Sequence, residues 1–417
     1  MVQPFDSSRL TPLAYLRAVV DYLKAEDPAV WQWFAEKRDD PQQAASIRLD
    51  LLKSTYRIER QTQPGLYALA DEAAAKLALD LPLTIYQAQH PQGLNASVAH
   101  LPSEIHLVLS GPLATTLSTI EIKALFGHEL AHRLLWEKWD GDYRVAAHLL
   151  EALANDPAGT AVYASTARLY WLYCELFCDR AAWMVTQDLS AAISTLVKVS
   201  TELKEVSAES YLRQADEIFS HHDARTEGLT HPECYIRARA LRLWLEQGDD
   251  ATPAIAAMLE APLALADLDL LGQKRVAHLT RRLVDQLLAP AWFQTERVLA
   301  HARSFFDDYG SPSENVAGNV LPSVTDESLA ADIVTRDTAL QDYYCYLLLD
   351  FATVDRDLEE LPLAAALVLA RRLSLADRFK DIVLKELKLT KKRFALLDNR
   401  AEELVADAES ATGEVAR

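Results

Sequence analysis

A His-Glu-x-x-His pattern, formed by His128, Glu129 and His132, constrains this chain more than any other feature of its sequence. Residues four apart lie on one face of an α-helix. Two imidazoles on one helical face can bind a single Zn²⁺ ion, and the carboxylate beside the first can serve as a general base toward water. The pattern therefore predicts a helix that carries half of a zinc site. A buried helix with two hydrogen-bonded histidines is the alternative interpretation.

The residues around this pattern favour a helix. Ser118 and Glu121 have the spacing of a capping box, in which each side chain satisfies a free backbone N–H at the start of a helix. The apolar-rich stretch 120–136 follows at once and has the pattern in its interior. The sequence thus predicts one long helix with both histidines in its middle.

A second pair of residues could complete the metal site. Glu175 and Asp179 are also four apart, in a mostly apolar stretch that is typical of a helix. A charged pair in such a stretch is costly to bury unless a partner binds it. Glu175 could be the third zinc ligand, and Asp179 could accept the second ring N–H of a ligating histidine. An ordinary helix with one acidic stripe is the alternative.

His-Glu-x-x-His followed by Glu-x-x-x-Asp resembles the gluzincins of metallopeptidase family 48, which include the CAAX prenyl endopeptidases and the heat-shock protease HtpX. Two further segments support the resemblance, which spans roughly residues 64–240. Asn95 and Ala96, followed by a strand over Ile105–Leu109, resemble the Asn-Ala turn and edge strand of the family. His231-Pro232 with Arg237 resembles its His-Pro-x-x-x-x-Arg signature.

The resemblance implies a role for each matching residue. In its terms the zinc ligands are His128, His132 and Glu175, the catalytic residues are Glu129 as general base and His231 as stabiliser of the oxyanion, the supporting residues are Asp179 and Arg237, and the substrate-binding residues are Asn95, Ala96, Ile105 and Leu107. It also implies one Zn²⁺ per chain, a polypeptide substrate and hydrolysis of peptide bonds by an endopeptidase. Cys178 departs from the family, where a small residue is common.

Composition limits the cellular setting. The net charge of −19 argues against binding of nucleic acid and of anionic membrane surfaces. The four cysteines form no Cys-x-x-Cys pair, which is typical of reduced thiols in a cytosol. The N-terminus lacks the pattern of a signal peptide, and no run of eighteen apolar residues predicts a transmembrane segment. We therefore expect a soluble, cytoplasmic variant of a family with many membrane proteins.

The expected fold class is α+β and predominantly α-helical, with a small sheet and two site helices. Strands are expected at Leu83–Gln87 and Ile105–Leu109, and a helix at 64–80. The expected organisation is an N-terminal helical segment (1–62), a catalytic domain (63–245), a helical extension (246–309), a linker rich in Gly, Pro, Ser and Asn (310–323), a C-terminal helical domain (324–400) and a frayed tail (401–417).

The C-terminal third leaves its role open. Residues 344–387 weakly resemble the acidic helical TerB-like modules of tellurite-resistance proteins, in which Asp350, Asp355 and Glu359 would lie near a metal; a solvated acidic face is the favoured interpretation. The region could hold the enzyme latent, or present helices to a protein partner. Two other functions of the whole chain stay open, namely a catalytically idle adaptor that keeps the zinc fold, and a zinc hydrolase of a non-protein amide.

Overall fold

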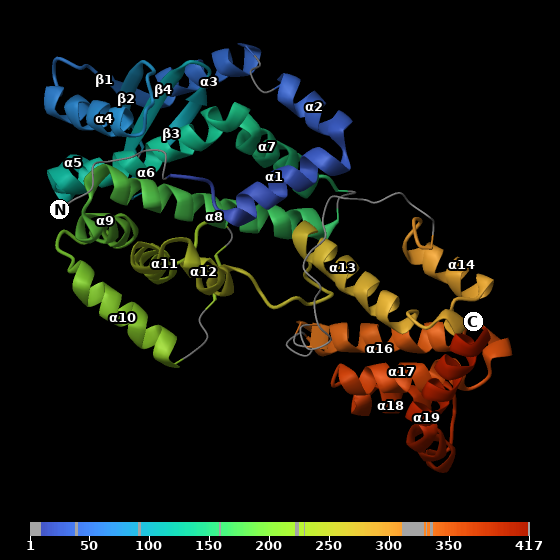
Figure 1. Ribbon diagram of the computed structural model, residues 1–417. Helices are drawn as coiled ribbons and strands as arrows, with labels where there is room; N and C mark the ends of the chain where they lie inside the picture. Colours follow the sequence, from blue (N-terminus) through green and yellow to red (C-terminus); the bar gives the residue numbers. More distant parts are fainter. Residues whose placement is uncertain are drawn as a thin grey trace. The chain divides into compact units, whose positions relative to one another are not determined.

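The computed structural model describes residues 10–37, 41–90, 93–157, 160–221, 225–228, 230–310, 329–330, 332–333 and 337–415. The chain divides into two compact units, Met1–Ala261 (the first unit) and Pro262–Arg417 (the second unit) (Figure 1). The fold is α+β and mostly helical with one small sheet, which confirms the expected class. The linker expected at 310–323 lies outside the described residues apart from Gly310.

The first unit contains the sheet and most of the longer helices. Its helices are α1 (Ala14–Glu26), α2 (Pro28–Lys37), α3 (Pro41–Ser54), α4 (Pro64–Lys76), α5 (Leu113–Thr116), α6 (Thr119–Glu137), α7 (Asp142–Ala154), α8 (Ala161–Thr186), α9 (Leu189–Thr201), α10 (Ala208–His221), α11 (Cys234–Gln247) and α12 (Thr252–Leu259). Both His-Glu-x-x-His and Glu-x-x-x-Asp are therefore helical, on α6 and α8.

The sheet has the strand order β1-β2-β4-β3. Its strands are β1 (Thr55–Ile58), β2 (Leu83–Ala88), β3 (Asn95–Leu101) and β4 (Glu104–Ser110). Strands β2 and β4, both expected from sequence, pair in parallel, whereas β3 is antiparallel to β4. The expectation of an edge strand at Ile105–Leu109 is wrong, because β4 is paired on both sides and β3 forms that edge of the sheet.

Local sequence features determine both the start of helix α6 and its close packing against α8. The predicted capping box is confirmed, with the Ser118 backbone N–H donating to Glu121 Oε2 at 2.8 Å. Halfway along, Gly127 lets α6 approach α8 closely, because a Cβ atom there would lie 3.0 Å from Val185 Cβ and 3.2 Å from Ala182 Cα. Helices α6 and α8 consequently lie side by side in close contact.

A buried arginine ties α6 to the edge strand. The side chain of Arg133 is fully buried, directly after the second histidine of the motif. Its Nη1 atom donates to the Leu101 carbonyl oxygen at 2.7 Å and lies 2.9 Å from His100 Nδ1. These bonds fix the C-terminal end of β3 relative to the site helix.

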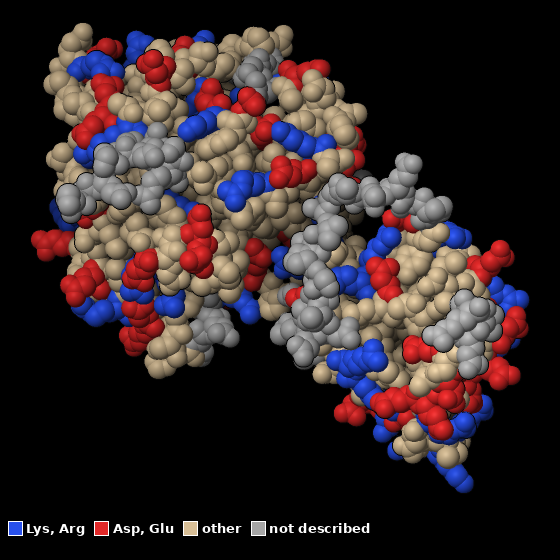
Figure 2. Space-filling view, in the orientation of Figure 1, with Lys and Arg blue, Asp and Glu red and all other residues tan. Residues whose placement is uncertain are grey.

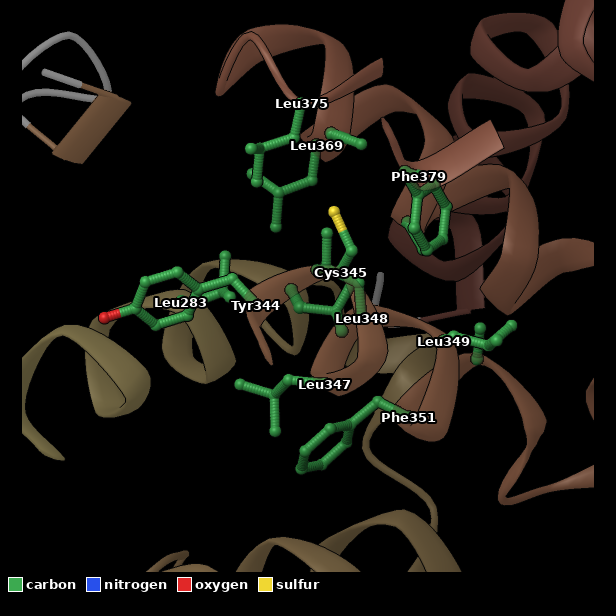
Figure 3. Close-up of a cluster of buried hydrophobic side chains, with 14 of the residues drawn as sticks. Leu283, Tyr344, Cys345, Leu347, Leu348, Leu349, Phe351, Leu369, Leu375 and Phe379 are labelled. Atoms are coloured by element: carbon green, nitrogen blue, oxygen red, sulfur yellow. The ribbon is translucent and has the colours of Figure 1, made fainter. Parts of the chain in front are cut away.

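The second unit is built from helices alone in its described part. These are α13 (Leu270–Leu287), α14 (Glu296–Phe305), α16 (Thr338–Thr353), α17 (Leu361–Arg372), α18 (Ala376–Glu386) and α19 (Lys391–Val415). They share one hydrophobic core, in which Leu283 of α13 packs with Tyr344, Leu348 and Phe379 of the later helices (Figure 3). The region expected as an extension, 246–309, is thus divided between the units, since α13 and α14 belong with α16 to α19.

The described surface is mixed in charge. On the face drawn in Figure 2, Lys and Arg side chains are interspersed with Asp and Glu on both units. Among the helices that the structure describes, none combines the length and the apolar character needed to cross a membrane.

Candidate metal centre and its cleft

The antiparallel packing of α6 and α8 brings the predicted metal ligands together. His128 Nε2 lies 3.4 Å from Glu175 Oε2, and His132 Nε2 lies 3.4 Å from Glu175 Oε1. One helical turn away, His128 Nδ1 lies 3.1 Å from Asp179 Oδ1. Both ring nitrogens of His128 therefore have a carboxylate partner, one on each of two successive turns of α8.

Arg237 on α11 joins this cluster from a third helix. Its Nη2 atom donates to Asp179 Oδ1 at 2.6 Å and its Nε atom to Asp179 Oδ2 at 2.8 Å, a two-pronged ion pair. Its Nη1 atom also lies 3.2 Å from Glu175 Oε2. All three side chains are buried, so Arg237 supplies the positive charge that two carboxylates in an apolar helix pair require.

The charges of the cluster shift the pKa values of its members. Burial would raise the pKa of the Glu175 carboxyl, but Arg237 and the two histidines outweigh it and hold the pKa well below its usual range. Burial would also lower the pKa of His128, whereas its bonds with Asp179 and Glu175 raise it to about 10. For Glu129 burial dominates and raises the pKa of its carboxyl.

His231 reaches the same cluster from the segment before α11. Its Nε2 atom lies 3.5 Å from Glu175 Oε1, and its side chain is 63% exposed. Arg168 on α8 anchors the segment by donating to the carbonyl oxygens of Thr226 and Gly228, both at 2.9 Å. Gly228 permits the turn, because a Cβ atom there would lie 1.9 Å from the His231 carbonyl oxygen.

Cys178 lies close beneath the two histidines. One donor atom from each of His128, His132 and Cys178 lies within 4.8 Å of the others. The thiol is fully buried, and burial raises its pKa well above the usual value. A thiolate is the form of cysteine that binds zinc. The carboxylate oxygens of Glu175 lie 3.4 Å from the Nε2 atoms of the two histidines.

A cleft of about 620 Å³ opens over these side chains. The residues predicted for catalysis and metal binding that line it are His128, Glu129, His132, Glu175, Asp179, His231 and Arg237. Asn95 and Ala96, at the start of β3, line it as well. Ile105 and Leu107 do not, because they lie fully buried inside the sheet on β4. Ser97 and Val98 of β3 line the cleft instead.

Several cleft residues were not predicted from the sequence. They include Trp136 on α6, Glu151 on α7 and Trp171 on α8. Each lies on a helix of ordinary composition. A single tryptophan or glutamate on such a helix has the pattern of a core or surface residue, so nothing marks it as part of a site. The spacing offered one signal, since Trp136 follows His132 by four residues and Trp171 precedes Glu175 by four.

The acidic residues singled out in the second unit have structural partners. Asp350 Oδ2 lies 2.7 Å from His301 Nε2. Asp355 accepts hydrogen bonds from Thr295 and Arg297 and caps a short 3₁₀ helix. Within the described part of the chain, potential metal donors of three side chains converge at His128 and not at these carboxylates.

Comparisons with known proteins point the same way as the geometry. No family model matches the chain, and no solved structure matches it. The chain is similar to the plastoglobule-localized metallopeptidase 48 of the chloroplast of Arabidopsis thaliana, with 26% identity over 214 residues, which is 47% of this chain and 61% of that protein. The match thus spans less than two thirds of the relative. It supports a peptidase that depends on a metal, at the level of the family.

Proposed function

We propose that this chain is a zinc-dependent endopeptidase that hydrolyses peptide bonds of polypeptides in the cleft over α6 and α8. The single observation that carries the proposal is the convergence of His128, His132 and Glu175 beside Glu129 in one open cleft. The similarity to a metallopeptidase supports it independently.

The donor set fits zinc. Three ligands of the His₂Glu type, with a fourth position left open, are found in catalytic zinc sites. Donor atoms at the corners of a tetrahedron with zinc–ligand distances of about 2.0–2.1 Å are roughly 3.4 Å apart. The distances from each histidine Nε2 to Glu175 are 3.4 Å. Glu175 Oε2 is moreover buried without a hydrogen bond from any described residue.

The protein's own groups have distinct tasks in this reaction. When bound, zinc supplies Lewis acidity toward a carbonyl oxygen and lowers the pKa of water. Glu129 takes a proton from the attacking water and returns it to the leaving amine. His231 donates a hydrogen bond to the oxygen on which negative charge develops. Asp179 fixes the tautomer of His128 by accepting its Nδ1–H, and Arg237 holds Asp179 in place.

We further propose that the substrate lies along β3. An edge strand has backbone N–H and C=O groups that can pair with an extended peptide, and Asn95 to Val98 line the cleft. Pairing through the backbone tolerates many sequences, which suits an endopeptidase.

The remaining predictions concern setting and regulation. We propose a cytoplasmic protein whose second unit keeps the peptidase latent or binds a protein partner through its helices. An adaptor without activity is the less economical interpretation, because such a protein needs no general base and Glu129 is present. A hydrolase of a non-protein amide differs in substrate alone and is separated by a panel of substrates.

The decisive experiment compares zinc-loaded wild-type protein with Glu129→Gln in the degradation of casein. We expect cleavage by the wild type and none by Glu129→Gln, although both bind one zinc per chain. Glu217→Gln, an exposed glutamate on α10, is the matched control and should cleave like the wild type. Equal cleavage by Glu129→Gln and wild type would refute the proposed role of Glu129.

A further inference from the structure

The cleft extends past the metal site in a direction set by the packing of α6 and α8. His128 faces Asp179 and His132 faces Glu175, so each step of four residues forward on α6 corresponds to four residues backward on α8. Continued by one more step, the same register places Trp136 and Trp171 at the same level along the two helices. Both indoles line the cleft and both are partly exposed.

The two indoles have different ring neighbours and are each partly exposed. Trp136 packs edge-on against His100, with ring centroids 5.3 Å apart, and is tilted toward His132 at 6.2 Å. Trp171 packs edge-on against Tyr170, at 6.3 Å. Neither indole is buried, so each retains surface at the cleft that its ring neighbours do not cover.

A third residue that lines the cleft carries a carboxylate. This residue is Glu151 on α7, and its carboxylate has no hydrogen bond or ion pair within the described part of the chain. Glu151 is an exposed residue, and the partial burial of its carboxyl raises the pKa with no basic side chain to oppose the effect. The arginine that lines the cleft, Arg237, is already paired with Asp179 and Glu175.

The geometry points to a subsite for a cation of the substrate, an ammonium or guanidinium group held by Trp136, Trp171 and Glu151. This inference rests on the proposed peptidase function and adds the class of substrate. The electron-rich faces of two indoles attract an organic cation, and tryptophan does so best among the aromatic residues. The carboxylate supplies the opposite charge. The chain's net charge of −19 adds a general attraction for basic peptides.

The subsite lies close to the reacting bond. Four residues of an α-helix rise about 6 Å, so the tryptophan pair is roughly that far beyond the turn of His132 and Glu175. An extended peptide advances about 3.3 Å per residue. The cationic group therefore belongs to a residue one or two positions from the scissile bond, on one side of it.

Two sources could supply the cation. One is a Lys or Arg side chain within a longer polypeptide, and the other is the free α-ammonium group at the start of a peptide. Both present the same chemistry to the indoles and to Glu151. They differ in whether acetylation of the side chain or of the N-terminus removes the charge.

The first test measures binding without catalysis. Full-length, zinc-loaded Glu129→Gln is titrated with a fluorescent peptide that contains one lysine, with its ε-acetyl-lysine form and with its N-terminally acetylated form. We expect removal of the relevant charge to weaken binding about tenfold. Loss on ε-acetylation assigns the side chain, and loss on N-acetylation assigns the terminus. Equal affinity of all three peptides would overturn the subsite.

Variants then locate the effect. Glu151→Gln and Trp171→Phe, introduced into Glu129→Gln, should reduce the preference for the charged peptide about fivefold or more. Glu217→Gln and the exposed Trp33→Phe are matched controls and should retain it. A preference that persists in both subsite variants would overturn the assignment.

The second test uses the active protein. Mass spectrometry of a digested mixture of denatured proteins should show Lys or Arg enriched at one position near the cleaved bond, and Glu151→Gln should lose the enrichment. Cleavage with neither this enrichment nor a preference for bonds one or two residues from a free N-terminus would contradict the subsite while leaving the peptidase intact. An absence of cleavage would count against the proposed function, and the binding experiment would still decide the subsite.

Discussion

Arg237 forms a bidentate ion pair with Asp179, in which Nη2 lies 2.6 Å from Oδ1 and Nε lies 2.8 Å from Oδ2. The same carboxylate contacts His128 Nδ1. A side chain on α11, distant in sequence from both site helices, thus holds the carboxylate that contacts the imidazole of His128, a proposed metal ligand. Lysine keeps the charge of arginine but lacks its planar fork.

Arg237→Lys should therefore weaken zinc binding by about 10- to 100-fold, the usual effect of losing a partner behind a ligand. Competition with a chromophoric chelator measures this affinity. Arg239→Lys is the matched control, because Arg239 pairs with Asp216 on α10 away from the cleft. Unchanged affinity in Arg237→Lys would show that Asp179 holds His128 without help.

Gly127→Ala should destabilise the first unit although alanine favours helices. The gain in helix propensity is roughly 1 kcal/mol, whereas overpacking of a core typically costs about 1–3 kcal/mol. The added methyl group would meet Val185 and Ala182. Urea unfolding of the metal-free protein should show the loss, and Val185→Ala should restore part of it. Gly65→Ala on α4 is the control, since no atom lies within 4 Å of its Cβ position and no loss is expected.

Glu121 should make the stability of the first unit depend on pH. Burial would raise the pKa of its carboxyl, but hydrogen bonds from Lys198, Ser118 and Ser194 lower it below the usual 4.5. Because the folded pKa is the lower one, the stabilisation is present above about pH 4.5 and is lost as the pH falls through the folded value.

The measurement compares Glu121→Gln with wild type by urea unfolding, with metal chelated throughout. At pH 7 the variant should be less stable by about 1–3 kcal/mol, and the difference should shrink below pH 4. Glu209→Gln, whose glutamate pairs with Arg213 on the surface, should change stability little at either pH. A stability difference that stays constant from pH 7 to pH 3 would contradict a lowered pKa for Glu121.

Cys178→Ala should leave zinc binding and turnover intact. Glu175 lies 3.4 Å from the Nε2 atom of each histidine and would complete a ligand set of known type. Cobalt substitution provides a direct readout, because a thiolate ligand gives intense charge-transfer absorption in the near ultraviolet. We expect identical cobalt spectra for wild type and Cys178→Ala. A band present in the wild type alone would make Cys178 a ligand.

Removal of Pro262–Arg417 tests latency. A cut near residue 310 would separate α13 and α14 from the core that they share with α16 to α19, so the boundary at 261 is the suitable one. The first unit should still bind one zinc per chain. Turnover above that of the full chain would support latency, and equal turnover by a folded first unit would contradict it.

The helices of the site could be predicted because their signals are local. Spacing of four residues, a capping box and an apolar run specify α6 within its own sequence, and Glu175 with Asp179 similarly marks α8. Strand order is not local. A central strand and an edge strand can have the same apolar pattern, and the choice between β3 and β4 depends on pairing with distant residues.

The residues that position the site could not be predicted from the sequence either. Arg168 and Gly228 act through carbonyl groups of a segment some sixty residues away in sequence, as the bond from Arg168 to Gly228 shows. Trp136, Trp171 and Glu151 come to one cleft through the packing of α6, α7 and α8, which the sequence alone does not provide. Short sequence motifs indicate the proposed metal ligands, whereas the residues that line the rest of the cleft depend on tertiary packing.

Because α6 and α8 pack in an antiparallel register, the relative positions of the cleft side chains depend on the number of residues between them in each helix. A single deletion between His132 and Trp136 would rotate the indole by about 100° around the helix axis and leave the histidines in place. A deletion between His128 and His132 would separate the two imidazoles onto different faces. Point substitutions can therefore tune either site, but changes of length within these helices would dismantle one of them while preserving helical content.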